Sequence, residues 1–311
     1  MKLISFRLPG SSVVRAGWLE GEWAISAGAA ADWLRVASPA SPSGRLSLID
    51  LIIHPDVVPT LRGALGEERP AGVAYRLAAV ELLAPLPEPR TLRDFYSFEA
   101  HVKTARANRG LEMIPEWYEA PVFYFSNPNA IFGPEATVPK PRATQKLDFE
   151  LEVAVVIGKE CRDLKPAEAD SVIAGYLIMN DWSARDVQAK EMKVGLGPAK
   201  GKDFATSLGP WLVTPDELAD TVRNGRPHLA MTARINGQEV ARGNLGDLHF
   251  SFGEMLARAS QDCTLYPGEV IGSGTVGTGC LLETGAHRWL EPGDVVELEV
   301  ERLGVLRNEI G

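Results

Sequence analysis

The chain has 311 residues, of which 45% are hydrophobic and 23% charged, so it is long enough for one large or two modest globular domains. Its 32 basic and 41 acidic residues give a formal net charge of −9 without a long run of lysine or arginine. This balance argues against nucleic acid or an anionic membrane surface as a partner. An anionic substrate would need local positive charge from a metal ion, an arginine or a lysine.

Cysteine usage and the N-terminal sequence indicate the compartment. The three cysteines, Cys161, Cys263 and Cys280, are widely spaced and odd in number, which is typical of a reducing compartment rather than of a disulfide framework. The N-terminal stretch reaches charged residues before a signal-length apolar core, and no apolar run is long enough to span a membrane. We therefore expect a cytoplasmic protein with no membrane partner.

The first part of the chain predicts a small α+β unit. Residues 2–8 and 13–23 alternate between apolar and polar, and the alanine-rich residues 24–36 have helical character. Pro85, Pro87 and Pro89 then favour an extended connection. We predict a small N-terminal domain over residues 1–88 and a larger domain over residues 89–311. A second proline-containing segment, residues 134–142, is expected to be a loop inside the larger domain.

Residues 94–102 predict the entrance of a helix. Phe95, Phe98, Val102 and Ala105 recur at the three-to-four spacing of a buried helix face. Asp94 or Ser97 would suit the N-cap position, and His101 lies beside the apolar stripe. From the residues alone, these side chains could be capping and packing groups or parts of a catalytic site.

The most informative segment combines acidic residues with a buried strand. In an extended strand Asp148, Glu150 and Glu152 would point to one face, and residues 153–158, which follow, are almost entirely apolar. Carboxylates at the mouth of a core strand repel each other unless a cation neutralises them, and oxygen ligands favour Mg²⁺, Ca²⁺ or Mn²⁺ over zinc. A solvated acidic edge is the alternative.

Short apolar strands separated by Gly and Pro turns continue from residue 147 to a period-two strand at residues 294–301. Residues 272–277 satisfy the GxGxxG pattern, but no helix is predicted after them, so we expect a glycine-rich turn close to a ligand rather than a dinucleotide site. Lys200 and Lys202 lie in a Gly/Pro loop that could hold an ammonium group over an oxyanion, although surface lysines are the ordinary interpretation.

Taken in order, these segments resemble the fumarylacetoacetate hydrolase family over about residues 94–283. The motifs that carry the resemblance are Asp94-Phe95-Tyr96-Ser97 with His101, Pro121-Val122-Phe123-Tyr124, Leu147 to Glu152, Asn180 to Gln188, Gly201-Lys202-Asp203-Phe204, Gly274-Thr275, and Glu283. The resemblance implies a mixed β-roll, an α+β and mostly β fold, with a smaller N-terminal domain, usually in a homodimer.

The resemblance also implies roles for residues of this chain. It places metal ligands at Asp94, Glu150, Glu152 and Asp181, with Mg²⁺ as the expected ion and Mn²⁺ or Ca²⁺ as alternatives. Catalytic roles fall to His101, Glu283 and Lys202, and substrate contacts to Tyr96, Tyr124, Gln188, Gly274 and Thr275. The motifs do not place the arginine that binds the substrate carboxylate; Arg106 and Arg109 are candidates.

The implied reaction is hydrolysis of a carbon–carbon bond in a β-diketo acid such as fumarylacetoacetate or an acylpyruvate, as in the catabolism of aromatic compounds. His101, oriented by Glu283, would activate water. Other activities of such a family remain open: 2-oxo acid decarboxylation, hydration of an unsaturated oxo acid, and enol–keto tautomerisation. A non-catalytic protein that binds a metal or an organic acid is the alternative from a different class.

Overall fold

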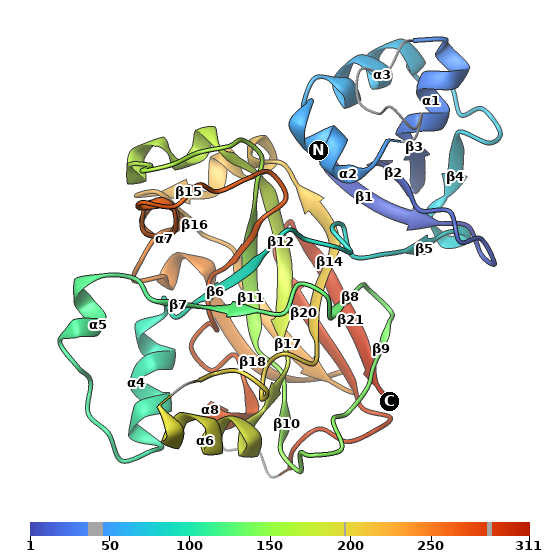
Figure 1. Cartoon of the computed structure of the whole chain (residues 1–311). Helices are drawn as coiled ribbons and strands as arrows, with labels where there is room; N and C mark the ends of the chain where they lie inside the picture. The colour runs from blue at the N-terminus through green and yellow to red at the C-terminus, as the bar shows by residue number, and fades with distance from the viewer. Residues whose placement is uncertain (37–45, 196, 285–287) are drawn as a thin grey trace.

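A twelve-stranded mixed sheet forms the centre of the computed structural model, which describes residues 1–36, 46–195, 197–284 and 288–311 (Figure 1). Its central strands are the long, almost wholly buried β11, β12 and β14. The strands of this sheet are β1 Lys2–Arg7, β2 Arg15–Glu20, β3 Trp23–Ser26, β4 Ala74–Arg76, β5 Glu81–Leu82, β6 Leu92–Phe95, β7 Phe123–Ser126, β8 Ile131–Phe132, β11 Leu151–Ile157, β12 Ile173–Asp181, β14 Thr206–Val213 and β19 Val270–Gly272.

A second sheet of five strands lies against the first, and two short strand pairs complete the β-structure. The five strands are β9 Thr137–Val138, β17 Ala230–Ile235, β18 Gln238–Asn244, β20 Val295–Val300 and β21 Gly304–Ile310. The short pairs are β10 Leu147–Asp148 with β13 Ser183–Ala184, and β15 Val222–Arg223 with β16 Arg226–Pro227. This sheet-dominated α+β architecture without a closed barrel confirms the predicted fold class.

The helices are short and lie at the periphery of the sheets (Figure 1). They are α1 Ala27–Leu34, α2 Leu48–Ile53, α3 Val57–Leu65, α4 Glu99–Ala107, α5 Glu116–Glu119, α6 Arg185–Val194, α7 Phe252–Ser260 and α8 Leu281–Thr284. Turns of 3₁₀ helix occupy Leu77–Ala79, Pro166–Ser171, Pro215–Thr221 and Leu245–Asp247. Within the described ranges, no helix combines the length and apolar character needed to cross a membrane.

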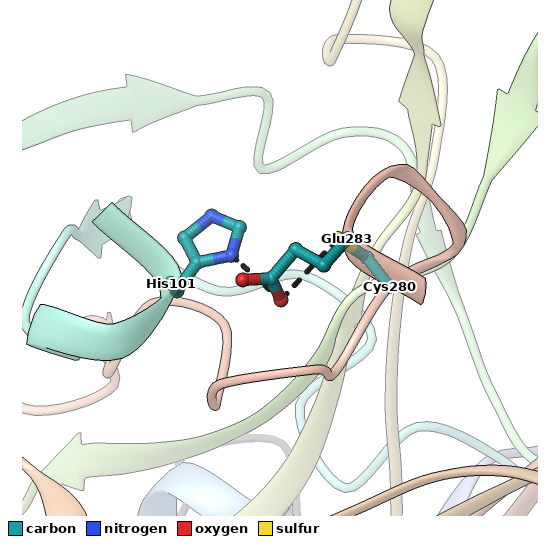
Figure 2. A group of neighbouring side chains, drawn as sticks. All are labelled: His101, Cys280 and Glu283. Carbon is teal, nitrogen blue, oxygen red and sulfur yellow. Dashed lines mark hydrogen bonds and ion pairs between the residues drawn. The ribbon is translucent and has the colours of Figure 1, made fainter. Parts of the chain in front are cut away.

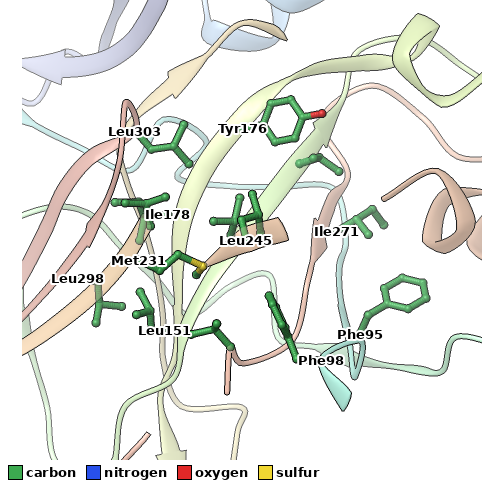
Figure 3. Packing of buried hydrophobic residues seen from close by; sticks show 14 of the residues in the cluster. Phe95, Phe98, Leu151, Tyr176, Ile178, Met231, Leu245, Ile271, Leu298 and Leu303 are labelled. Atoms are coloured by element: carbon green, nitrogen blue, oxygen red, sulfur yellow. The ribbon is translucent and has the colours of Figure 1, made fainter. Parts of the chain in front are cut away.

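Strand β11 explains how one sheet can separate two cores. Its odd-numbered residues from Leu151 to Ile157 pack towards the second sheet, whereas Ala154 and Val156 pack towards the N-terminal helices. Both faces are therefore apolar, as predicted for residues 153–158. Figure 3 shows the first of these cores, where Leu151 and Ile178 lie near Met231 and Leu298 of the second sheet.

The N-terminal segment has the predicted α+β composition, and its strands extend the main sheet. Strand β1 pairs antiparallel with β14, and residues of α1 to α3 share a core with β11 and β12. Figure 1 shows these helices gathered at one end of the molecule. The domain boundary near residue 88 remains a prediction. Residues 134–142, expected to be a loop, contain the two-residue strand β9.

The helix predicted to enter within residues 94–102 is present, but Asp94 and Ser97 do not cap it. Asp94 lies in β6, which pairs with β19 and β7, and the helix begins only at Glu99 after an N-cap at Phe98. Ser97 does not cap it, because its hydroxyl oxygen accepts no hydrogen bond from the described residues of the helix. Long-range strand pairing thus overrides the local helical pattern before residue 98, while Val102 and Ala105 form the expected buried face.

A buried ion pair fixes the register of β6 against the turn before β19. Arg93 and Glu269 are 4% and 3% exposed and bind each other, and the Thr91 hydroxyl also donates to Glu269. Replacing Glu269 by alanine would leave a buried guanidinium unpaired, so the free energy of unfolding should fall by about 3–5 kcal/mol. Urea denaturation followed by circular dichroism measures this loss.

The matched control is Glu239→Ala, which removes the partner of the exposed Arg242. Solvent screens this surface pair, so its denaturation midpoint should stay at the wild-type value. Equal midpoints for the two variants would contradict the structural role of the Arg93–Glu269 pair.

Candidate active site

Four buried carboxylates converge at one edge of the main sheet. Asp94 comes from β6, Glu152 from β11 and Asp181 from the end of β12, while Glu150 lies in the short segment between β10 and β11. One oxygen of each lies within 4.8 Å of the others, and all four residues are at most 4% exposed. Strands β6, β19, β11 and β12 are successive neighbours in the sheet, which brings these residues together.

The prediction that Asp148, Glu150 and Glu152 share one face of a strand is wrong for Asp148. The strand is interrupted between β10 and β11, at Phe149 and Glu150, so the alternation does not continue through the segment. Asp148 instead accepts hydrogen bonds from the backbone N–H groups of Leu281 (2.8 Å) and Leu282 (3.1 Å). It therefore holds the start of α8 rather than joining the carboxylate cluster.

Two buried cations accompany the carboxylates. The Lys202 ammonium donates to both Glu150 and Asp181, whereas Lys200 is exposed and pairs with Asp203. The Arg185 guanidinium donates through Nε to Asp148 (2.8 Å), and its Nη2 lies 2.8 Å from Glu150. Of the two loop lysines, only Lys202 belongs to the site. Sequence reasoning gave Arg185 no role, although it lies four residues after a predicted ligand at the start of α6.

Burial and neighbouring charge set the protonation of the cluster. Burial, reinforced by neighbouring carboxylates, raises the pKa values of Asp94 and Glu152 well above their ordinary values. Burial alone would raise the pKa of Glu150 too, but the positive charges of Lys202 and Arg185 outweigh this effect and lower it. Burial raises the pKa of Asp181 as well, partly opposed by Lys202. Glu150 is thus held ionised, whereas Asp94, Glu152 and Asp181 favour the protonated form.

Unpartnered oxygen atoms show that the cluster suits a cation. Glu152 Oε2 and Asp181 Oδ1 are buried and have no hydrogen-bond partner among the described residues. Buried carboxylate oxygens without partners are costly, and oxygen-only donors are the ligands preferred by hard divalent ions. The other oxygens are supported: Thr275 donates to Glu152 Oε1 (3.2 Å), Tyr124 to Asp181 Oδ2 (2.5 Å) and the Gly274 N–H to Asp94 Oδ1 (3.2 Å).

Gly274 is required at its position for a steric reason. Its φ is +79°, and a Cβ there would lie 2.4 Å from the Phe95 carbonyl oxygen. The turn after β19 therefore passes close enough to β6 for its N–H to reach Asp94. The glycine-rich turn expected near a ligand is present, and its Gly274 N–H supports a carboxylate of the cluster.

His101 and Glu283 form a second group beside this cluster (Figure 2). His101 is on α4 and Glu283 on α8, and the imidazole Nδ1 lies 3.1 Å from Glu283 Oε2. The Cys280 thiol donates to the same oxygen at 3.7 Å. The Tyr96 ring stands edge-on to the imidazole at 5.4 Å, and burial raises the pKa of Tyr96 to about 12, so its phenol stays neutral.

A cavity of about 400 Å³ is lined by His101 and by Asp94, Glu150 and Glu152 of the cluster, whereas Asp181 and Glu283 are not among its lining residues. Arg109 lines it together with the Asn108 and Met192 side chains, whereas Arg106 is not part of its wall and donates to the Glu112 carbonyl. Asn108, Met192 and Arg185 are lining residues that sequence reasoning did not single out. The predicted residues that line the cavity are Asp94, Tyr96, His101, Tyr124, Glu150, Glu152, Gln188, Lys202, Gly274 and Thr275.

Comparison with known proteins decides the family. Residues 90–311 match the family described as fumarylacetoacetate (FAA) hydrolase C-terminal. The chain belongs to the fumarylacetoacetate hydrolase family. A 2,4-didehydro-3-deoxy-L-rhamnonate hydrolase of a Sphingomonas species is 35% identical over 193 residues, 61% of this chain and 65% of that protein. A human mitochondrial oxaloacetate tautomerase is 38% identical over 194 residues, 61% of this chain and 59% of that protein. The matches thus span less than two thirds of either relative.

Solved structures of the family share the fold over the whole chain. A fumarylacetoacetate hydrolase from Exiguobacterium antarcticum has a TM-score of 0.72 at 26% identity, with 100% of this chain and 99% of that chain covered. A 5-carboxymethyl-2-hydroxymuconate delta-isomerase from Mycobacterium smegmatis has a TM-score of 0.69 at 27% identity, with the same coverage. The family therefore includes both hydrolases and isomerases on this scaffold.

The raised pKa values of Asp94 and Glu152 predict that metal binding releases protons. Without an ion these carboxylates hold protons at pH values where free carboxylates are ionised, and a divalent ion binds only the ionised form. Affinity for Mg²⁺ should therefore rise with pH and level off once the pH exceeds both raised values. Calorimetric titration of chelator-stripped protein in two buffers of different ionisation enthalpy counts the protons released.

Glu152→Gln should release fewer protons and bind Mg²⁺ roughly tenfold or more weakly. Glu160→Gln, which changes an exposed carboxylate, is the matched control and should behave as wild type. Binding heats that do not depend on the buffer would contradict the protonated state of the cluster.

Proposed function

We propose that the protein is a metal-dependent hydrolase that cleaves a carbon–carbon bond in a β-diketo acid of the fumarylacetoacetate or acylpyruvate kind. The observation that carries the proposal is the His101–Glu283 pair, whose imidazole lines the same cavity as three carboxylates of the cluster. A general base beside a cation site is what hydrolysis of an enolisable diketone needs.

The carboxylate cluster would hold the ion through Asp94, Glu150, Glu152 and Asp181. When bound, a divalent cation supplies Lewis-acid stabilisation of the negative charge on the enol or enolate oxygens. We propose Mg²⁺, with Mn²⁺ or Ca²⁺ as alternatives, because the donors are hard carboxylate oxygens. Tyr124 and Lys202 donate to Asp181, and Gly274 and Thr275 donate to Asp94 and Glu152, so these contacts would orient the ligands.

His101 would take a proton from the water that attacks the substrate carbonyl. Glu283 lies 3.1 Å from the imidazole and would stabilise the imidazolium that forms. The contact lacks the alignment of a hydrogen bond in the absence of substrate, a common property of catalytic pairs that tighten on binding. The proton on His101 can then be passed to the departing enolate carbon, so that two acids leave the site.

The negative charge that would develop on the attacked carbonyl oxygen needs hydrogen-bond donors from the cavity wall. Arg185 donates to Gln188 Oε1 at 3.2 Å, which leaves the amide NH₂ of Gln188 for a substrate oxygen. Lys202 uses two of its N–H groups on Glu150 and Asp181 and has a third to offer. Arg109, which lines the cavity, is the candidate for a substrate carboxylate, in preference to Arg106.

A tautomerase is the second candidate, because the human relative at 38% identity is named an oxaloacetate tautomerase. Enol–keto conversion would use the same cluster and move a proton through His101 without attack by water. The two functions differ in their products, because hydrolysis alone breaks the carbon chain.

A homodimer and a cytoplasmic location belong to the same proposal. The edge strand β7 carries Phe125 at 61% exposure, an exposed apolar side chain of the kind that subunit contacts cover. The three cysteines are free, and Cys263 is exposed, which supports a reducing compartment. The expected partner is a small oxo or diketo acid.

The products of turnover test the proposal. Chelator-stripped protein, with and without added Mg²⁺, is mixed with acylpyruvates, fumarylacetoacetate and oxaloacetate while the ultraviolet enol absorbance is followed. We expect Mg²⁺-dependent loss of the diketo-acid enol band with two acid fragments. Interconversion of enol and keto oxaloacetate without fragments would replace the hydrolase by a tautomerase, and release of CO₂ would indicate a decarboxylase. Binding without turnover of any of these acids would leave a non-catalytic binding protein.

His101→Asn tests the base directly. The variant should keep its Mg²⁺ affinity, because His101 lies outside the carboxylate cluster, but kcat should fall by roughly 10²–10⁴. His54→Asn changes a half-buried histidine at the end of α2, outside the cavity lining, and is the matched control. An unchanged kcat for His101→Asn on a confirmed substrate would remove the base from the mechanism.

A further inference from the structure

His101, Cys280 and Glu283 form a compact group of mixed ligands beside the carboxylate cluster (Figure 2). We propose that this group is a second metal site, which binds one Zn²⁺ or another thiophilic divalent ion through nitrogen, sulfur and oxygen. An ion there would engage both members of the proposed base pair and would block it. Binding at this site does not depend on the proposed function; only the inhibition does.

The spacing of the three ligand atoms fits a tetrahedral ion. Zinc–sulfur bonds of about 2.3 Å and zinc–nitrogen or zinc–oxygen bonds of about 2.0 Å place neighbouring ligand atoms about 3.3–3.5 Å apart. Here Nδ1 of His101 lies 3.1 Å from Glu283 Oε2, and the Cys280 sulfur lies 3.7 Å from the same oxygen. One ligand atom from each of the three residues lies within 4.8 Å of the others. Shifts of a few tenths of an ångström would bring these two contacts to the spacing that a tetrahedral zinc ion requires.

Two buried atoms of the group lack partners, which points to a ligand. His101 Nδ1 and Glu283 Oε1 have no hydrogen-bond partner among the described residues. The side chains of His101 and Glu283 are only 6% and 1% exposed, so water does not readily satisfy these atoms. Unpaired buried polar atoms cost free energy, and an ion bound to His101 Nδ1 and to the Glu283 carboxylate would remove that cost for the imidazole nitrogen.

The chemistry of the donors separates this site from the carboxylate cluster. One imidazole, one thiol and one carboxylate are ligands that zinc accepts, whereas four carboxylates suit magnesium, calcium or manganese. Three protein ligands also leave a fourth position of a tetrahedral ion open to water or substrate. The two groups should therefore take different ions at the same time.

The fold holds the second group in place. Asp148 accepts from the N–H groups of Leu281 and Leu282, which lie between Cys280 and Glu283 in the chain. Helix α4, which carries His101, packs against α8. Burial, with the Asp148 charge, raises the pKa of the Cys280 thiol, so an arriving ion has to displace its proton.

Cobalt(II) provides a direct probe of the site. The full-length protein, with the carboxylate cluster saturated by excess Mg²⁺, is titrated with Co²⁺ and its absorption recorded. We expect one Co²⁺ per chain with thiolate-to-cobalt charge-transfer absorption and the intense visible bands of a tetrahedral ion. Added Zn²⁺ should abolish both. Absence of the charge-transfer band in the wild-type protein overturns the proposal.

Variants of the cysteines assign the ligand. Cys280→Ser should lose the charge-transfer band and bind Zn²⁺ roughly tenfold or more weakly, while Cys263→Ser, at an exposed cysteine, keeps the wild-type spectrum. Cys280→Ala gives the same comparison if the serine variant unfolds, and thermal melting of each variant in Mg²⁺ shows which are folded. A band that persists in a folded Cys280 variant, or that disappears with Cys263→Ser, overturns the site.

Discussion

Excess negative charge at one edge of the main sheet is the constraint on which the site depends. Five buried carboxylates, on Asp94, Asp148, Glu150, Glu152 and Asp181, face two buried cations, Lys202 and Arg185. An unpaired ion costs several kcal/mol in a protein interior, so the site must supply cations or retain protons. It does both: Lys202 and Arg185 keep Glu150 ionised, while Asp94 and Glu152 favour protons. A divalent ion meets the same need, which makes the cluster suited to a metal.

The parts of the structure that could be predicted from the sequence are those set by local pattern. The apolar run after Glu152 forms a strand buried on both faces, and residues 294–301 contain the strand β20 with alternating burial. The residues carried by the family resemblance also meet in space, from Asp94 on β6 to Glu283 on α8. Short motifs of this kind can identify the residues of a site, because each motif holds its functional side chains within a few residues of the chain.

The errors arose where long-range pairing overrides local pattern. Asp94 reads as a helix cap because the apolar spacing continues through Phe95, yet β6 is fixed by β19 and β7, which are distant in sequence. Strand alternation predicts that Asp148 shares a face with Glu150, yet the strand is interrupted and Asp148 bonds instead to Arg185 and the start of α8. The role of Arg185 depends on partners that only the folded chain brings together, so spacing alone could not assign it.

Asp148 and Arg185 connect the cation site to the proposed base. Arg185 contacts Glu150 of the cluster and donates to Asp148, and Asp148 in turn holds the first N–H groups of α8, the helix that carries Glu283. Two ion-pair contacts and one set of backbone hydrogen bonds thus link the cluster to the helix that carries the partner of His101. Hydrolases and tautomerases both need a stabilised enolate, but only hydrolysis needs water activated at a fixed position. A base whose partner is anchored to the cation site would hold such a water for the proposed hydrolase and would hold the transferred proton for a tautomerase.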